Sequence, residues 1–151
     1  MTCVQVKNNL LISCSFDKTV QLWNMERHEK LWELDHGDKV WCTILRDDQV
    51  ITCCRDKSVR VLALQSGTEL HRLEHPAACK NADLSPNKSL LAVACDSSVV
   101  LWNINNVVKV KQFDFDSRTF DLRFNPSGDR IIVGLGDGQV IKIEMKYEVL
   151  R

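Results

Sequence analysis

The 151-residue sequence has no excess charge of either sign, because 20 lysines and arginines balance 20 aspartates and glutamates. A nucleic-acid-binding protein usually carries a basic excess or stripe, so nucleic acid is not the expected partner. Long apolar runs are also lacking: the longest is the six-residue stretch Leu90 to Cys95, whereas a membrane-spanning helix needs about 20 residues. No basic segment followed by an apolar block opens the sequence, so neither a signal peptide nor a membrane anchor is expected.

The sequence contains seven cysteines but no Cys-x-x-Cys pair, and no metal-ligand set is predicted from them. Without a secretory signal, the thiols are expected to stay reduced, as in a cytoplasmic or nuclear protein. Two of their spacings are equal, because Cys3 and Cys42 are 39 residues apart and so are Cys14 and Cys53. Equal spacing of this kind indicates an internal repeat rather than a metal site.

Four segments of the sequence align in one register, namely 15–25, 54–64, 95–104 and 136–145. Each segment contains an aspartate that is followed three residues later by a valine; these aspartates are Asp17, Asp56, Asp96 and Asp137. They are spaced 39, 40 and 41 residues apart, which indicates a unit of about 40 residues. One repeat region, 1–151, is therefore predicted, with approximate repeats 1–35, 36–74, 75–113 and 114–151.

Each repeat has the pattern of short strands separated by turns. β-Branched and apolar residues gather in the expected strands 2–6, 10–15, 19–24, 30–34, 69–73 and 108–113, and 146–150 is a possible last strand. Turn formers such as Asn8-Asn9 and Pro126-Ser127-Gly128 lie between strands, and no stretch has the pattern of a long amphipathic helix. Four short antiparallel strands every 40 residues predict an all-β chain of about four propeller blades.

The sequence resembles the WD40-repeat family over nearly its whole length. Trp23-Asn24 and Trp102-Asn103 occupy the place of the motif's closing Trp-Asp, and His36 and His75 occupy that of its opening histidine. The resemblance implies a β-propeller; since the family's rings usually have about seven blades, a partial propeller is expected, with open blade faces available for self-association. A closed four-bladed ring and two chains forming an eight-bladed ring are the alternatives. Short links between strands, as in 45–53, also resemble those of F-box/WD-repeat ubiquitin-ligase adaptors.

In this family a His–Ser/Thr–Asp–Trp network typically joins the strands of each blade. Its candidate members here are Ser13, Asp17 and Trp23; His36, Thr52 and Asp56; His75, Asp96 and Trp102; and Asp137. The second repeat has Leu62 where the tryptophan is expected. We interpret the aspartates as turn residues that accept backbone N–H groups. Because the set recurs at the repeat spacing, it indicates a structural network rather than a catalytic triad, and no catalytic, cofactor-binding or metal-binding residue is predicted.

The resemblance also implies a protein-binding top face, with contact positions flanking each first strand and preceding each turn aspartate. These positions are Thr2, Phe16, Lys39, Trp41, Arg55, Ala78, Lys80, Cys95, Arg118, Phe120 and Gly136. The set holds three aromatic and four basic residues and no acid, which favours acidic or phosphorylated segments of other proteins as partners. Two large apolar residues of the outer strands, Trp32 and Phe113, are interpreted as packing between blades, with an exposed side patch as the alternative.

The predicted function is therefore a non-enzymatic interaction scaffold that binds peptides or domains on its top face. Such a scaffold would recruit a substrate to a larger complex, for example a ubiquitin ligase. The alternatives are an RNA-associated scaffold in RNA processing or ribosome assembly and, less favoured, an enzyme on a propeller fold. An enzyme would need a non-repeated cluster of His, Asp or Cys residues, and the sequence offers none.

Overall fold

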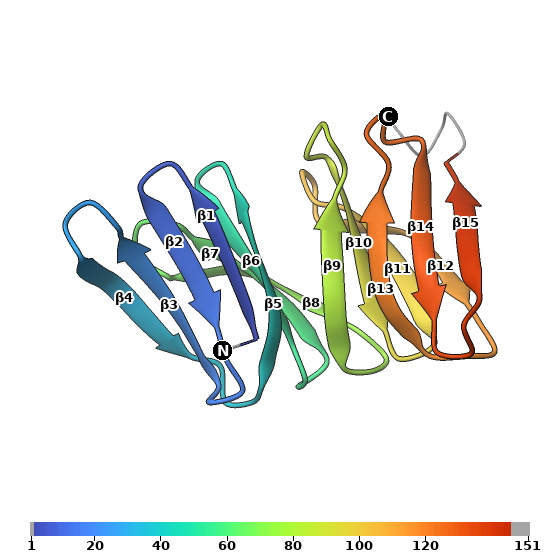
Figure 1. The fold of residues 1–151 in the computed structure, drawn as a ribbon, viewed down its shortest axis with the longest axis horizontal. Helices are drawn as coiled ribbons and strands as arrows, with labels where there is room; N and C mark the ends of the chain where they lie inside the picture. Colours follow the sequence, from blue (N-terminus) through green and yellow to red (C-terminus); the bar gives the residue numbers. More distant parts are fainter. Residues whose placement is uncertain (1, 146–151) are drawn as a thin grey trace. The chain divides into compact units, whose positions relative to one another are not determined.

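The computed structural model describes residues 2–145, and every regular element in that range is a β-strand. Figure 1 shows these strands arranged in four antiparallel sheets, in each of which strands that are neighbours in sequence lie side by side. Among the described residues, no helix has the length and apolarity needed to cross a membrane. The all-β prediction is confirmed. The chain divides into two compact units, residues 1–79 and residues 80–151, which are described in turn.

The first unit contains two four-stranded sheets. The first sheet consists of β1 (Cys3–Lys7), β2 (Leu10–Cys14), β3 (Thr19–Asn24) and β4 (Glu29–Asp35), in that order. The second consists of β5 (Val40–Arg46), β6 (Gln49–Cys54), β7 (Ser58–Ala63) and β8 (Glu69–Glu74). The inner hairpins turn at Asn8 and Asp47, whose φ angles of 55° and 48° are in the left-handed region that Asn and Asp tolerate.

The core of the first unit lies between its two sheets. Apolar residues at alternate positions of the first sheet, including Ile12, Val20 and Leu22, pack against Val50 and Leu62 of the second. All five of these side chains are 1% exposed or less, and their burial supplies most of the force that holds the two sheets together. Successive strand residues point to opposite faces, and Val4, Val6 and Leu31 of the first sheet are exposed.

The second unit contains one four-stranded sheet and one sheet with three described strands. The four-stranded sheet consists of β9 (Cys79–Leu84), β10 (Leu90–Cys95), β11 (Ser98–Asn103) and β12 (Val108–Asp114). The other consists of β13 (Thr119–Phe124), β14 (Arg130–Leu135) and β15 (Val140–Glu144). The possible last strand at 146–150 lies outside the described residues. Leu90, Leu101, Leu122, Ile131 and Val133 form the centre of this unit's core.

The two large outer-strand residues pack inward within their own units. Trp32 of β4 contacts the core of the first unit, and its indole Nε1 donates a 2.7 Å hydrogen bond to the carbonyl of Leu64 after β7. The ring also covers Gly67, whose φ of +72° allows the loop to turn beneath it. Phe113 of β12 packs against the core of the second unit. Both positions therefore show packing between sheets rather than an exposed patch.

Candidate protein-binding surface

Three of the four repeated aspartates accept a backbone N–H group two residues further on. Asp17 accepts from Thr19 at 2.9 Å, and Asp56 from Ser58 at 3.0 Å. In the fourth repeat, Asp137 accepts from Gln139, also at 3.0 Å. These short-range bonds hold the turn between the second and third strands of each sheet, as is usual for Asx side chains.

Asp96 in the third repeat differs from the other aspartates. Its hairpin is one residue shorter, because Ala94 pairs with Val99 and Cys95 with Ser98, and Asp96 itself occupies the left-handed region with φ of 46°. The carboxylate consequently points to solvent and lies 3.5 Å from the guanidinium Nε of Arg118. The sequence alignment predicted that Asp96, like the other three aspartates, accepts a backbone N–H group in its turn. That prediction differs from the structure because the hairpin of the third repeat is one residue shorter.

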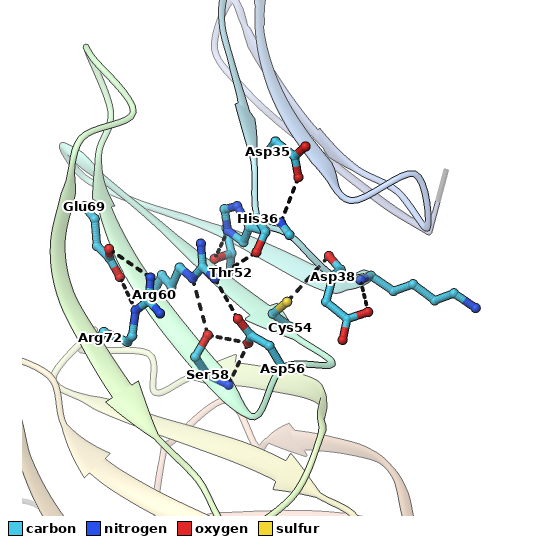
Figure 2. Close-up of polar contacts among 12 residues, drawn as sticks. Asp35, His36, Asp38, Thr52, Cys54, Asp56, Ser58, Arg60, Glu69 and Arg72 are labelled. Carbon is cyan, nitrogen blue, oxygen red and sulfur yellow. Dashed lines mark hydrogen bonds and ion pairs between the residues drawn. The ribbon is translucent and has the colours of Figure 1, made fainter.

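The second repeat contains a polar network that Figure 2 shows in close-up. His36 Nε2 lies 2.8 Å from Thr52 Oγ1, and Asp56 accepts a 2.5 Å hydrogen bond from the hydroxyl of Ser58. Arg60 connects the two halves, because its Nη2 donates to Asp56 Oδ2 at 2.6 Å and to the carbonyl of His36 at 2.9 Å. The guanidinium thus donates a hydrogen bond to the aspartate in the repeat where the expected tryptophan is absent.

Arg60 was missed by reasoning from the sequence, although a signal was present. It stands between two buried valines, Val59 and Val61, where a strand of this pattern would ordinarily place an apolar or small polar residue. A long charged side chain at such a position needs a partner, and Asp56 is four residues away across the hairpin.

The environment of the network shifts two pKa values. Burial and, to a smaller extent, the nearby charge of Arg60 together lower the pKa of His36 to about 4. Burial raises the pKa of Asp56, but hydrogen bonds from Ser58 and Arg60 outweigh this effect, and the pKa of that carboxyl lies below its ordinary value. His36 is therefore neutral and Asp56 charged at neutral pH, which suits a structural ion pair.

The first repeat is connected differently from the expected Ser13–Asp17–Trp23 trio. The indole Nε1 of Trp23 donates to Gln21 Oε1 at 3.3 Å, and the carboxylate of Asp17 accepts a 2.6 Å bond from the hydroxyl of Thr19. Asp17 is exposed in its turn, so it is satisfied locally and does not require partners from the sheet. Ser13 lies half-buried in β2 opposite Gln21.

In the third repeat, the candidate network residues belong to strand ends. His75 directly follows β8, and its Nδ1 lies 3.0 Å from the carbonyl oxygen of Leu73. Trp102 is half-buried in β11, opposite Leu91 of β10.

Three of the predicted contact residues form one cluster on the first unit. The rings of Phe16 and Trp41 meet edge to face, with centroids 4.7 Å apart and planes at 72°. Lys39 Nζ lies 5.0 Å from the centre of the Phe16 ring. The Trp41 indole Nε1 is buried and has no hydrogen-bond partner among residues 2–145. We call Phe16, Lys39 and Trp41 the aromatic–lysine cluster.

The first unit holds three further predicted contact residues. Arg55 is exposed, and its backbone N–H donates to the carbonyl of Lys39 at 2.9 Å. Thr2 is half-buried and uses its hydroxyl internally, donating to the carbonyl of Val40 at 2.6 Å. Ala78 is also half-buried, just before β9. Of these three residues, only Arg55 presents a charged side chain to solvent.

The second unit brings together Lys80, Phe120 and Gly136. Lys80 Nζ lies 5.4 Å from the centre of the Phe120 ring. A Cβ atom at Gly136 would stand 2.7 Å from that ring, so only glycine lets the phenylalanine lie across this turn. Arg118 is exposed, but its charge is paired with Asp96.

Cys95 is the predicted contact residue that the structure removes from the surface. The shorter hairpin of the third repeat keeps Cys95 inside β10, paired with Ser98, and it is 0% exposed. A buried thiol at this position cannot contact a partner. The exposed predicted positions of the second unit are therefore Arg118, Phe120 and Gly136, and Lys80 is half-buried beside them.

Sheets of four strands with aspartate turns at a 40-residue spacing are the structure of propeller blades. The family model described as WD domain, G-beta repeat, matches residues 1–24 and 67–103. The WD40 β-propeller domain of Doa1 matches with a TM-score of 0.87 over 98% of this chain and 52% of that chain, at 20% identity. The computationally designed Ika4 protein matches with 0.85 over 96% and 91%, at 21% identity. The chain therefore has the fold of a WD40 β-propeller, and two parts of it match the WD40 family model.

Curated relatives are WD-repeat proteins of several systems. The small ribosomal subunit protein RACK1 of Drosophila melanogaster is 29% identical over 112 residues, 69% of this chain and 35% of that protein. The U3 small nucleolar RNA-associated protein 15 homolog of Xenopus tropicalis is 23% identical over 137 residues, 88% of this chain and 27% of that protein. The chain thus spans about a quarter to a third of these relatives.

Proposed function

We propose that the aromatic–lysine cluster of the first unit binds acidic segments of partner proteins. The observation that carries the proposal is the cluster itself. The Lys39 ammonium group and the Trp41 indole both contact the exposed ring of Phe16, and the buried indole N–H lacks a partner among the described residues. A carboxylate or phosphate of the partner would pair with Lys39. Aromatic rings beside a cation are the composition typical of binding hot spots.

The pair of Lys80 and Phe120 on the second unit provides a further contact of the same chemistry. Phe120 is 58% exposed, and the lysine lies over its ring, as Lys39 lies over Phe16. Arg118 contributes less positive charge, because Asp96 pairs with it. A scaffold with such contacts would hold a substrate protein within a larger assembly.

A binding role rather than catalysis is supported by how the chemically capable residues are used. Thr52 and His36 are bonded to each other, and Asp56 is held by Ser58 and Arg60. Each is committed to a structural contact, and burial keeps His36 neutral at physiological pH. The seven free thiols support a reducing compartment, the cytoplasm or the nucleus.

A second candidate is an RNA-associated scaffold. It is favoured by the names of two relatives, one a small ribosomal subunit protein and the other a U3 small nucleolar RNA-associated protein. The zero net charge weighs against direct RNA contact, since phosphate neutralisation usually needs several basic side chains. In this case the chain would join an RNA-containing complex through protein contacts.

The test measures binding of three fluorescent probes by anisotropy: an acidic peptide, its serine-phosphorylated form and a neutral peptide of the same length. We expect the two acidic probes to bind, and Lys39→Glu combined with Arg55→Glu to weaken them by about tenfold or more. Lys111→Glu is the matched control, because Lys111 Nζ also lies 5.0 Å from a phenylalanine ring, that of Phe113 on an outer strand. Equal effects of the control and the double variant would refute the site.

A single-stranded RNA probe of the same charge tests whether the chain contacts RNA directly. Tighter binding of RNA than of either acidic peptide, with a steep loss on adding salt, would favour direct RNA contact. Binding of the peptides alone supports the first proposal.

A further inference from the structure

Four cysteines of the first unit lie in two directly opposed cross-strand pairs. Cys3 of β1 is paired in register with Cys14 of β2, and Cys42 of β5 is paired with Cys53 of β6. The two pairs occupy equivalent positions in the first and second repeats, which explains their common spacing of 39 residues. Residues that are directly opposite on antiparallel strands point to the same face of the sheet.

The two pairs join into one row of sulfur atoms. The side chains of Cys14 and Cys42 both interact with the side chain of Cys3, and that of Cys42 also interacts with Cys53. The row therefore runs Cys14, Cys3, Cys42, Cys53, from one sheet of the unit to the other. We call it the thiol row.

Hydroxyl groups border the row at the Cys3 and Cys14 end. Thr43 Oγ1 donates to Cys3 Sγ at 3.9 Å, and Thr2 Oγ1 lies 3.2 Å from Cys14 Sγ. A polar border of this kind stabilises a negative sulfur better than an apolar core would. The buried Cys54, on the same strand as Cys53 but on the other face, lies outside the row.

Accessibility and acidity both single out Cys3. Cys3 is half-buried, whereas Cys14 and Cys53 are each 1% exposed and Cys42 is 8% exposed. The hydrogen bonds from Cys14 and Cys42 lower the pKa of the Cys3 thiol. The same bonds, with burial, raise the pKa of Cys14 and Cys42. Cys3 is thus the most accessible thiol of the row; its Sγ donates to the carbonyl of Thr43 at 3.8 Å, so it must lose its proton before it reacts.

We propose that Cys3 and Cys14 are a peroxide-oxidised cysteine pair that closes to a cross-strand disulfide. The Cys3 thiolate attacks hydrogen peroxide, the O–O bond breaks, and the products are a sulfenic acid and, after protonation, water. The sulfur of Cys14 then attacks the sulfenic sulfur, the S–O bond breaks, and a second water leaves. Two thiols are oxidised to one disulfide, and one peroxide is reduced to two waters.

The strand geometry favours Cys14 over Cys42 as the resolving residue. Directly opposed residues on antiparallel strands have Cα atoms about 4.5–5.5 Å apart, within the range of about 4.4–6.8 Å found in disulfides. Cys3 and Cys14 meet this condition within one hairpin sheet, with backbone pairing already in place. Cys42 belongs to the adjacent sheet, so a bridge from Cys3 to Cys42 would have to draw two sheets together. The inference is independent of the proposed peptide binding.

The test is disulfide mapping of the folded 151-residue chain. The chain is fully reduced, treated with one equivalent of hydrogen peroxide, blocked with N-ethylmaleimide and digested with trypsin without reductant. Cleavage after lysine and arginine places Cys3 in peptide 1–7, Cys14 in peptide 8–18, Cys42 in peptide 40–46 and Cys53 with Cys54 in peptide 47–55. We expect the linked pair 1–7/8–18 to exceed any other linked pair by about fivefold or more.

Two variants complete the experiment. Cys14→Ser should leave a Cys3 sulfenic acid that dimedone captures, and Cys54→Ser, the control outside the row, should leave the 1–7/8–18 link unchanged. If Cys14→Ser does not fold, the same mapping is done on the wild-type chain unfolded in urea. There the 1–7/8–18 linked pair should no longer exceed the other linked pairs. The proposal is overturned if the excess persists in urea, if Cys3 links mainly to Cys42, or if Cys3 stays reduced while other thiols are oxidised.

Discussion

The guanidinium of Arg60 lies 2.6 Å from the carboxylate of Asp56, and this ion pair holds the second repeat together where a tryptophan is absent. Arg60 is only 9% exposed and Asp56 26% exposed, so the pair is partly withdrawn from water. The same guanidinium bonds the carbonyl of His36, which connects the pair to the residue that precedes β5. One side chain thus joins a turn, a strand and a loop.

Replacing Arg60 is expected to destabilise the chain more than replacing its equivalent in the first repeat. Arg60→Met leaves the half-buried carboxylate of Asp56 without its cation, which should cost about 2 kcal/mol of the free energy of unfolding. Gln21→Met is the matched control, because Gln21 occupies the same position and makes no contact with a buried charge. Urea unfolding followed by tryptophan fluorescence measures both variants. Equal losses would contradict a special role for the ion pair.

The chain is expected to lose stability as the pH falls from about 6.5 to about 4. Burial lowers the pKa of His36 to about 4, so in this range the unfolded chain binds a proton that the folded chain does not. The shift corresponds to at most about 3 kcal/mol, and the loss levels off below the folded pKa. Asp56 acts at lower pH, because its pKa is below the ordinary 3.8 and its contribution is lost only as pH falls past that value.

Unfolding free energies at half-unit pH steps measure this dependence. His36→Gln keeps a polar side chain near Thr52 but cannot be protonated, so its stability should be nearly flat between pH 6.5 and pH 4.5. A wild-type slope that survives in His36→Gln would assign the effect to other groups.

A methyl group at Gly67 is expected to disturb the packing of Trp32. Gly67 has φ of +72°, and an added Cβ would stand 3.0 Å from the indole ring. Gly37 is the matched control, because its φ is +81° and nothing lies within 4 Å of its Cβ position. Both alanine variants bear the backbone cost of about 1–2 kcal/mol, and Gly67→Ala should lose roughly 1 kcal/mol more. Thermal unfolding compares them; equal losses would show that the ring moves aside freely.

The exposed apolar side chains of the first and last sheets predict self-association. Val6 is 52% exposed on β1 and Val140 is 70% exposed on β15, each on a face that no other described sheet of its unit covers. Light scattering behind a sizing column should show a mass that rises with concentration, and Val6→Lys combined with Val140→Lys should lower it. Val108→Lys, at an equally exposed position of β12, should have no such effect. A monomer at every concentration would contradict the prediction.

Features that depend on neighbours in the chain were predictable. Strand positions follow from alternating apolar residues, and the turn role of Asp17 and Asp56 follows from a bond that reaches only two residues. The pairing of His36 with Thr52 also follows the repeat spacing, because both residues keep their place in the blade pattern. Such patterns need no knowledge of what lies across the core.

Features that depend on partners far away in the sequence were not predictable from the sequence. The contact of Phe16 with Trp41 joins two sheets, and the role of Arg60 depends on which side chains surround it after folding. The hairpin of the third repeat is one residue shorter than the others. Cys95, which the spacing of the sequence aligns with Phe16 and Arg55, therefore lies inside β10 and not on the expected surface. The sequence alone determined the repeat, the strands and the turns, because these rest on local periodicity and short-range hydrogen bonds. Tertiary structure decided which thiols, rings and charges meet, because burial and pairing are properties of the packed sheets.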